Sequence, residues 1–152
     1  AIERKELFLV YQPIVRLADA EIAGFEALMR WEHPKRGNIS PTEFIPIAEE
    51  TGLINQIGDW VFRESARLAK TWYDAASASD MEAGVIQISV NKSPIQFRTQ
   101  ASQKNEWPTY LQQLELPGQS MVIEITEGLL LGSSTSVTDK VTMPINTSLM
   151  PP

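Results

Sequence analysis

Two apolar runs open the chain, and both have the composition of β-strands. The first extends from Leu7 to Val15 and the second from Ile22 to Trp31, with about six residues between them. A parallel connection between strands needs a dozen or more residues. We therefore predict that these two strands form an antiparallel pair.

Helical periodicity follows the opening strands. Ser40 and Thr42 are candidate cap residues for a short helix that ends at Gly52. From Asn55 to about Ser77, apolar residues recur with the spacing of a helix that buries one face. We predict two consecutive helices here, separated at the glycine.

The next segments alternate between strand and helix. Val85 to Val90 has the pattern of a third strand, and a helical stretch begins at Ser93 and restarts at Pro108 to reach Leu114. Met121 to Thr126 is the last strand that the pattern predicts. Strands that alternate with helices indicate an α/β fold with a parallel sheet.

The composition narrows the classes of function. The chain of 152 residues, with no internal repeat, fits one globular domain, followed from Gly128 by a poorly specified tail that is rich in Ser and Thr. It has no cysteine, which excludes disulfides and thiolate sites. A formal net charge of −6 argues against a nucleic acid polymer as the partner.

The sequence also bears on location. No apolar run reaches the roughly 18 residues of a membrane span, and the first thirty residues lack the pattern of a signal peptide. We expect a cytoplasmic location without membrane contact in this segment, either as a separate protein or as the cytoplasmic portion of a larger membrane-anchored one.

Polar side chains stand in the later part of each predicted strand. Because alternate residues share a face, Glu26, Asn91 and Glu124 are placed on the face that is not purely apolar. The carboxyl ends of parallel strands form the usual ligand crevice. Carboxylate and amide oxygens suit Mg²⁺, Mn²⁺ or Ca²⁺. The alternative interpretation, which spacing alone favours, is that these are partly solvated strand residues near loops.

Other chemically notable residues favour structural roles. His33 is the only histidine, so we interpret it as a loop residue rather than a metal ligand. Trp60, Phe62 and Trp72 lie in a predicted helix with an apolar stripe, which favours a place in the core or an interface over contact with a ligand. Residues 133–136 have no nearby histidine base, which argues against a nucleophilic serine.

Five motifs, in order, resemble those of the EAL-domain family, phosphodiesterases and sensors of the bacterial messenger cyclic di-GMP. They are YQPIV at Tyr11 to Val15, EALMRW at Glu26 to Trp31, FIPIAEETG at Phe44 to Gly52, SVNKSPIQF at Ser89 to Phe97 and IEITE at Ile123 to Glu127. The resemblance extends from about Ala1 to Leu131. It implies that residues 1–131 are the amino-terminal half of an EAL domain and that residues 132–152 are a divergent tail. It implies a (β/α)8 barrel of the TIM type whose first strand is antiparallel to the others.

The resemblance also implies roles for particular residues. Glu26, Asn91 and Glu124 match metal-binding positions for Mg²⁺ or Mn²⁺, and Glu127 matches a glutamate that supports the next loop. Gln12, Leu28 and Arg30 match residues that contact the ligand, and an arginine fork suits phosphate oxygens. The family reaction is hydrolysis of cyclic di-GMP to linear pGpG, a two-metal task.

The sequence departs from the family pattern after Glu127. The family's next strand carries a DDFGTG motif, which is absent, and the only later acid is Asp139. A full barrel takes roughly 250 residues. We therefore expect about four strands, open sheet edges completed by homo-oligomerisation or by an unusual repacking of the tail, and no complete catalytic site.

Three classes of function follow from these expectations. The first is an active phosphodiesterase, which the missing motif disfavours. The second is a non-catalytic module that binds cyclic di-GMP weakly, with one weakly held cation or with none. The third is an oligomerisation or regulatory module that acts through its exposed edge.

Overall fold

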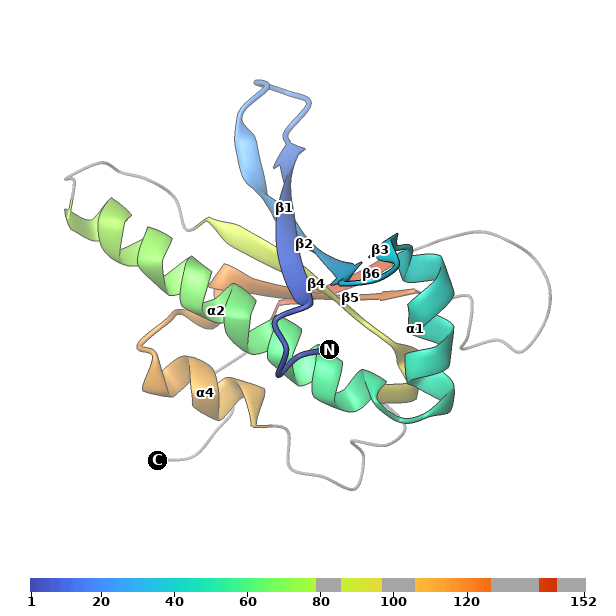
Figure 1. Ribbon diagram of the computed structural model, residues 1–152. Helices are drawn as coiled ribbons and strands as arrows, with labels where there is room; N and C mark the ends of the chain where they lie inside the picture. The colour runs from blue at the N-terminus through green and yellow to red at the C-terminus, as the bar shows by residue number, and fades with distance from the viewer. Residues whose placement is uncertain (79–85, 97–105, 127–139, 145–152) are drawn as a thin grey trace.

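The computed structural model describes residues 1–78, 86–96, 106–126 and 140–144 (Figure 1). The strands are β1 (Leu7–Val15), β2 (Ile22–His33), β3 (Gly37–Ile39), β4 (Gln87–Lys92), β5 (Met121–Thr126) and β6 (Lys140–Pro144). The helices are α1 (Pro41–Glu50), α2 (Ile54–Ala78) and α4 (Trp107–Gln113), with a 3-10 turn at Gly118–Ser120. Among these residues, no helix is long and apolar enough to cross a membrane.

The described strands form a single mixed sheet. Its order is β1-β2-β4-β5-β6, and β3 pairs with β2 beside this path. The antiparallel pairing of β1 with β2 confirms the prediction from the short connection. Strands β2, β4 and β5 are parallel neighbours, which confirms an α/β arrangement. Figure 1 shows the β1–β2 hairpin projecting beyond the rest of the sheet.

The prediction of about four strands is wrong, because the sheet of the described residues has six. The two additional strands are short: β3 completes a tight hairpin with the end of β2, and β6 pairs antiparallel with β5. The last predicted strand does not have an open edge, because β6, which lies in the predicted tail, covers it, as the expected alternative of a repacked tail implies. The boundary at Leu131 lies outside the described residues.

Two smaller predictions need correction. The third predicted strand starts at Gln87 rather than Val85, and Ile86 lies before it. His33 is the last residue of β2 rather than a loop residue. Its Nδ1 accepts hydrogen bonds from the backbone N–H groups of Lys35 and Arg36, 3.2 and 3.3 Å away, so the imidazole organises the β2–β3 turn.

The two consecutive helices are confirmed, with the predicted signals at their ends. The hydroxyl of Ser40 accepts from the backbone N–H of Thr42 and caps α1. Gly52 has φ +75°, a conformation that favours glycine, directly after α1 ends. The turn between the helices is therefore encoded locally.

The core lies between the sheet and α2, which runs across one face of it (Figure 1). Phe62 is fully buried and stacks on Trp107, with ring centroids 4.2 Å apart and an interplanar angle of 3°. Trp72 packs against Tyr11 and Phe25 of the hairpin. Phe62 is therefore a core residue, as one of the two predicted alternatives states, and Trp60 and Trp72 are half-buried against the core.

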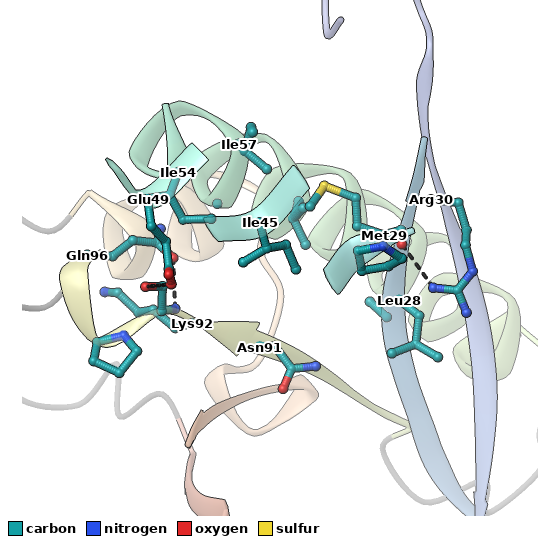
Figure 2. A pocket seen from close by; sticks show the side chains of 16 residues that line it. Leu28, Met29, Arg30, Ile45, Glu49, Ile54, Ile57, Asn91, Lys92 and Gln96 are labelled. Carbon is teal, nitrogen blue, oxygen red and sulfur yellow. Dashed lines mark hydrogen bonds between the residues drawn. The ribbon is translucent and has the colours of Figure 1, made fainter. Parts of the chain in front are cut away.

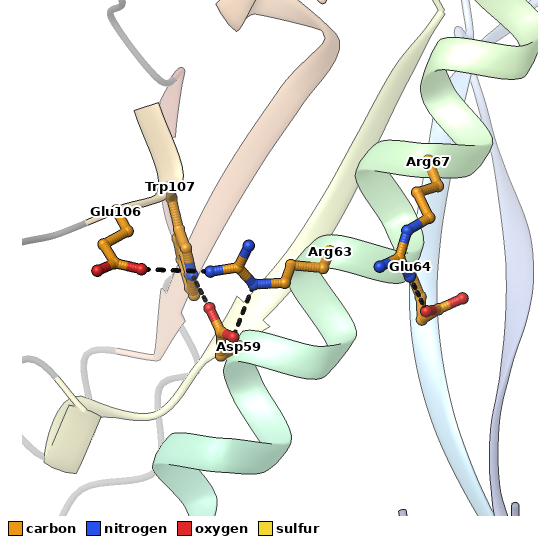
Figure 3. Close-up of polar contacts among 6 residues, drawn as sticks. All are labelled: Asp59, Arg63, Glu64, Arg67, Glu106 and Trp107. Carbon is orange, nitrogen blue, oxygen red and sulfur yellow. Dashed lines mark hydrogen bonds and ion pairs between the residues drawn. The ribbon is translucent and has the colours of Figure 1, made fainter. Parts of the chain in front are cut away.

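Polar contacts attach α4 to α2 at the edge of this core (Figure 3). Trp107 Nε1 donates a hydrogen bond to Asp59 Oδ1 at 3.1 Å, and Arg63 Nε donates to Asp59 Oδ2 at 2.8 Å. Asp59 thus orients the indole that stacks on Phe62, and the end of α4 is fixed relative to the long helix.

Candidate functional site

The polar residues predicted from alternation line up across the face of the sheet opposite α2. Gln12 of β1 pairs in register with Glu26 of β2, and Glu26 pairs with Ser89 of β4. Asn91, two residues later on the same face of β4, pairs with Glu124 of β5. The register therefore places these side chains on one face of the sheet, in a row from β1 to β5 that shifts by two residues along β4.

A direct contact joins two members of this row. Asn91 Nδ2 donates a hydrogen bond to Glu26 Oε1 at 2.8 Å, although 65 positions separate the two residues in the sequence. Glu124 is buried, with 7% of its surface exposed. The structure thus brings together Glu26 and Asn91 by contact and Glu124 by register.

The neighbours of these residues face the helices instead. Ala27, Val90 and Ile123 are buried in the core against α2. Lys92, directly after Asn91, is also buried on that side, with Nζ 4.4 Å from the centre of the Trp107 ring. Burial lowers the pKa of the Lys92 ammonium. Its charge is therefore directed away from the row that contains Asn91.

A pocket of about 330 Å³ opens where β2 and β4 end (Figure 2). Leu28, Arg30 and Asn91 line it from the strands, and residues of α1 and α2 line its other side. Figure 2 shows Glu49, Lys92 and Gln96 gathered at one end and Leu28 and Arg30 at the other. The pocket is at the lower limit of the size range of small-molecule sites.

Arg30 is the cation among the residues predicted to contact a ligand, and it lines the pocket. Its side chain is half-buried, and Nη1 donates to the carbonyl oxygen of Met29 at 2.9 Å. Gln12 lies exposed on β1, at the register position opposite Glu26. Glu127, the predicted loop support, lies outside the described residues.

The donor set is suited to one hard cation. Glu26 and Glu124 supply carboxylates and Asn91 supplies an amide oxygen, the donor types that Mg²⁺ and Mn²⁺ accept. Within the ranges that the structure describes, no three His, Cys, Asp or Glu side chains form a cluster. A cation here would therefore depend on the Asn91 amide as its third protein donor.

Sequence reasoning missed four polar residues of the pocket, one of which is the buried Lys92. Glu49, Ser93 and Gln96 line it together, and Ser93 Oγ donates to Glu49 Oε1 at 2.6 Å. The signal that identifies two of them is S-x-x-Q at Ser93 to Gln96, with Pro94 at the first helical position. This spacing is typical of a capping box at a helix start.

Comparison with known proteins identifies the family of the chain. The family model of the EAL domain matches residues 1–146. A signalling protein of Caulobacter vibrioides is 41% identical over 133 residues, which is 85% of this chain and 15% of that protein. The bifunctional diguanylate cyclase/cyclic di-GMP phosphodiesterase MucR of Pseudomonas aeruginosa is 40% identical over 127 residues, 84% of this chain and 18% of MucR.

The fold has a counterpart among solved structures. The MucR phosphodiesterase in complex with c-di-GMP superposes with a TM-score of 0.73 and 40% identity, over 84% of this chain and 49% of that one. This chain thus spans about half of the solved domain and under a fifth of these curated relatives. From the match to residues 1–146 and the identity to these relatives, the chain belongs to the EAL-domain family.

Proposed function

We propose that this chain supplies the amino-terminal half of a cyclic di-GMP site and holds one divalent cation with Glu26, Asn91 and Glu124. The observation that carries the proposal is the Asn91–Glu26 hydrogen bond, which joins β2 to β4 on the face opposite α2. Asn91 is also the register partner of Glu124 on β5. The bound cyclic di-GMP in the related MucR structure supports the identity of the ligand.

Each residue of the site has a separate task in this proposal. The two glutamates and Asn91 hold the cation, which when bound lowers the pKa of a coordinated water and stabilises phosphate oxygens. Arg30 orients a phosphate through its planar fork of donors. Leu28 supplies apolar contact at the pocket wall, and Gln12 supplies an amide at the exposed end of the row.

We also propose that the 152-residue chain, tested by itself, binds cyclic di-GMP weakly and does not hydrolyse it. Phosphodiester hydrolysis with two metals needs donors for both ions. The resemblance assigns the second set to a DDFGTG motif, and this motif does not occur in the 152 residues. One cation is therefore held without the neighbour that completes the reaction.

Calorimetry and product analysis test these proposals separately. Titration of the chain with Mn²⁺ should give one site, and Glu26→Gln should weaken it about a hundredfold. Titration with cyclic di-GMP should give weak binding that Arg30→Ala reduces at least tenfold. Arg16→Ala is the matched control, because Arg16 is an exposed arginine of the hairpin paired with Asp19.

The opposing results are equally distinct. No heat with cyclic di-GMP at millimolar concentration removes the binding proposal. Two Mn²⁺ ions per chain, or pGpG released in the presence of Mn²⁺ and detected by chromatography, contradicts the proposed lack of hydrolysis. Each result applies to the 152-residue chain tested by itself.

A second candidate function is self-association through β1. Within the described residues, β1 is the terminal strand of the sheet and exposes Phe8, Val10 and Ile14. An exposed apolar edge favours pairing with another chain. Sedimentation should then show a concentration-dependent oligomer that Val10→Lys dissociates, and a monomer at all concentrations would contradict this candidate.

A further inference from the structure

We propose that a buried cap formed by Ser93 and Gln96, clamped between α1 and α2, positions Asn91 for the site, and that Gly58 is the residue that makes room for it. The inference deepens the proposed function by naming residues that act through Asn91 and do not contact the ligand themselves. It rests on three contacts around the segment that follows β4.

The first contact is a reciprocal cap at the helical turn of residues 94–96. Ser93 Oγ accepts from the backbone N–H of Ile95 at 3.2 Å, and Gln96 Oε1 accepts from the backbone N–H of Ser93 at 3.0 Å. Ser93 stands two residues after Asn91. The cap therefore fixes the backbone immediately after the strand that presents Asn91.

The second contact is with α2. Gln96 is 1% exposed, and its amide lies directly against Gly58 in the second turn of that helix. A Cβ atom at position 58 would lie 2.8 Å from Gln96 Cδ and closer still to Nε2. Alanine is ordinarily the better residue inside a helix. Glycine at this position is explained by the space that the Gln96 amide occupies.

The third contact is with α1. Ser93 Oγ donates to Glu49 Oε1 at 2.6 Å, so this hydroxyl links the cap to α1 as well as capping the turn. Figure 2 shows Glu49 and Gln96 close to Lys92, at the end of the pocket away from Arg30. The chain after β4 is thus held by contacts with both α1 and α2. These contacts fix the position of Asn91, two residues before Ser93.

A double-mutant cycle tests the role of Gly58. Gly58→Ala should reduce the Mn²⁺ affinity about tenfold, the lower end of the loss seen when a residue that orients a metal ligand is replaced. In a Gln96→Ala background the same change should have no further effect, because the clashing amide is gone. Equal losses in both backgrounds would overturn the proposal.

A metal-free measurement separates this inference from the proposed function. The side-chain NH₂ signal of Asn91 in a ¹⁵N–¹H spectrum, assigned by its absence in Asn91→Asp, reports the hydrogen bond to Glu26. Gly58→Ala should move this signal toward its position in Glu26→Ala, which lacks the acceptor. If the wild-type chain binds no Mn²⁺, the proposed function fails, while this signal still decides the inference.

Two further variants control for general damage. Ala69→Gly weakens the same helix at another buried position, about three turns after Gly58, and should leave the Asn91 signal in place. If Gly58→Ala does not fold, Ser93→Ala should move the signal and Ser93→Thr, which keeps the hydroxyl, should restore it. An unmoved signal in Ser93→Ala would overturn the proposal.

Discussion

The two faces of the sheet are formed by alternate residues of the same strands, yet they differ in chemistry. Toward α2, the side chains of Ala27, Val90 and Ile123 join Phe62 in an apolar core. On the opposite face, the residues adjacent to these in each strand form the row that includes Glu26, Asn91 and Glu124. One face is held by burial of apolar surface, and the other by register and individual hydrogen bonds.

This difference indicates how stability and function are divided. A side chain on the α2 face contributes through the area that it buries, which is the dominant favourable term in folding. A side chain on the opposite face contributes through its position relative to its neighbours. Substitutions on the first face should therefore change the free energy of unfolding, and those on the second should change ligand and metal binding.

The largest effect on stability is expected at Phe62. Phe62→Ala removes a fully buried ring stacked on Trp107 and should lower the free energy of unfolding by about 3–5 kcal/mol. Phe8→Ala on the opposite face, where the ring is 40% exposed, is the matched control and should cost about 1 kcal/mol or less. Urea unfolding measures both, and equal losses would remove the distinction between the faces.

A smaller effect is expected at the junction of α2 and α4. Asp59→Ala removes the acceptor of Trp107 Nε1 and of Arg63 and should cost about 1–2 kcal/mol. Glu64→Ala removes only the exposed ion pair with Arg67, also shown in Figure 3, and should cost about 0.5 kcal/mol or less. A loss in Glu64→Ala as large as that in Asp59→Ala would contradict the assigned role of Asp59.

On the opposite face, binding should change without a large change in stability. Glu26→Gln keeps an acceptor for Asn91 but removes the charge, so the Mn²⁺ affinity should fall about a hundredfold. The free energy of unfolding, measured in EDTA, should change by about 1 kcal/mol or less. Glu21→Gln in the exposed hairpin turn is the control. A collapse of stability in Glu26→Gln would place Glu26 among the structural residues.

The smallest effect is expected to depend on pH. Glu6 accepts hydrogen bonds from Arg4 Nε at 2.6 Å and from Trp31 Nε1 at 3.1 Å. The hydrogen bond from Arg4 is the main cause that holds the pKa of the Glu6 carboxyl below its usual value, against the effect of burial. The folded state therefore binds the proton less readily than the unfolded state, in which a glutamate has a pKa of about 4.3.

The sign of this linkage gives a pH window. The stabilisation is fully present above the unfolded pKa and is lost as the pH falls through the lowered folded pKa. Wild type should therefore be more stable than Glu6→Gln at pH 6–7, and the difference should shrink below about pH 4. Thermal unfolding across this range measures it, with Glu50→Gln in α1 as control. A difference that grows on acidification would contradict the assignment.

Much of the fold was predictable because its signals are local. The short connection between Leu7–Val15 and Ile22–Trp31 predicted their antiparallel pairing, and the apolar stripe predicted α2. The strands β3 and β6 were not predicted, since each is short and is defined by its partner rather than by its own pattern. The site residues were placed on the correct strands, but their roles remain predictions.

The sequence by itself determined the alternation that puts Glu26, Asn91 and Glu124 on one face and their neighbours on the other, because a strand has a period of two. It also determined family membership through the order of its motifs. Only the tertiary structure decided that Asn91 donates a hydrogen bond to Glu26 and that the Gln96 amide packs against Gly58. Both contacts depend on the register between segments far apart in the chain, which is set by the packing of α2 on the sheet.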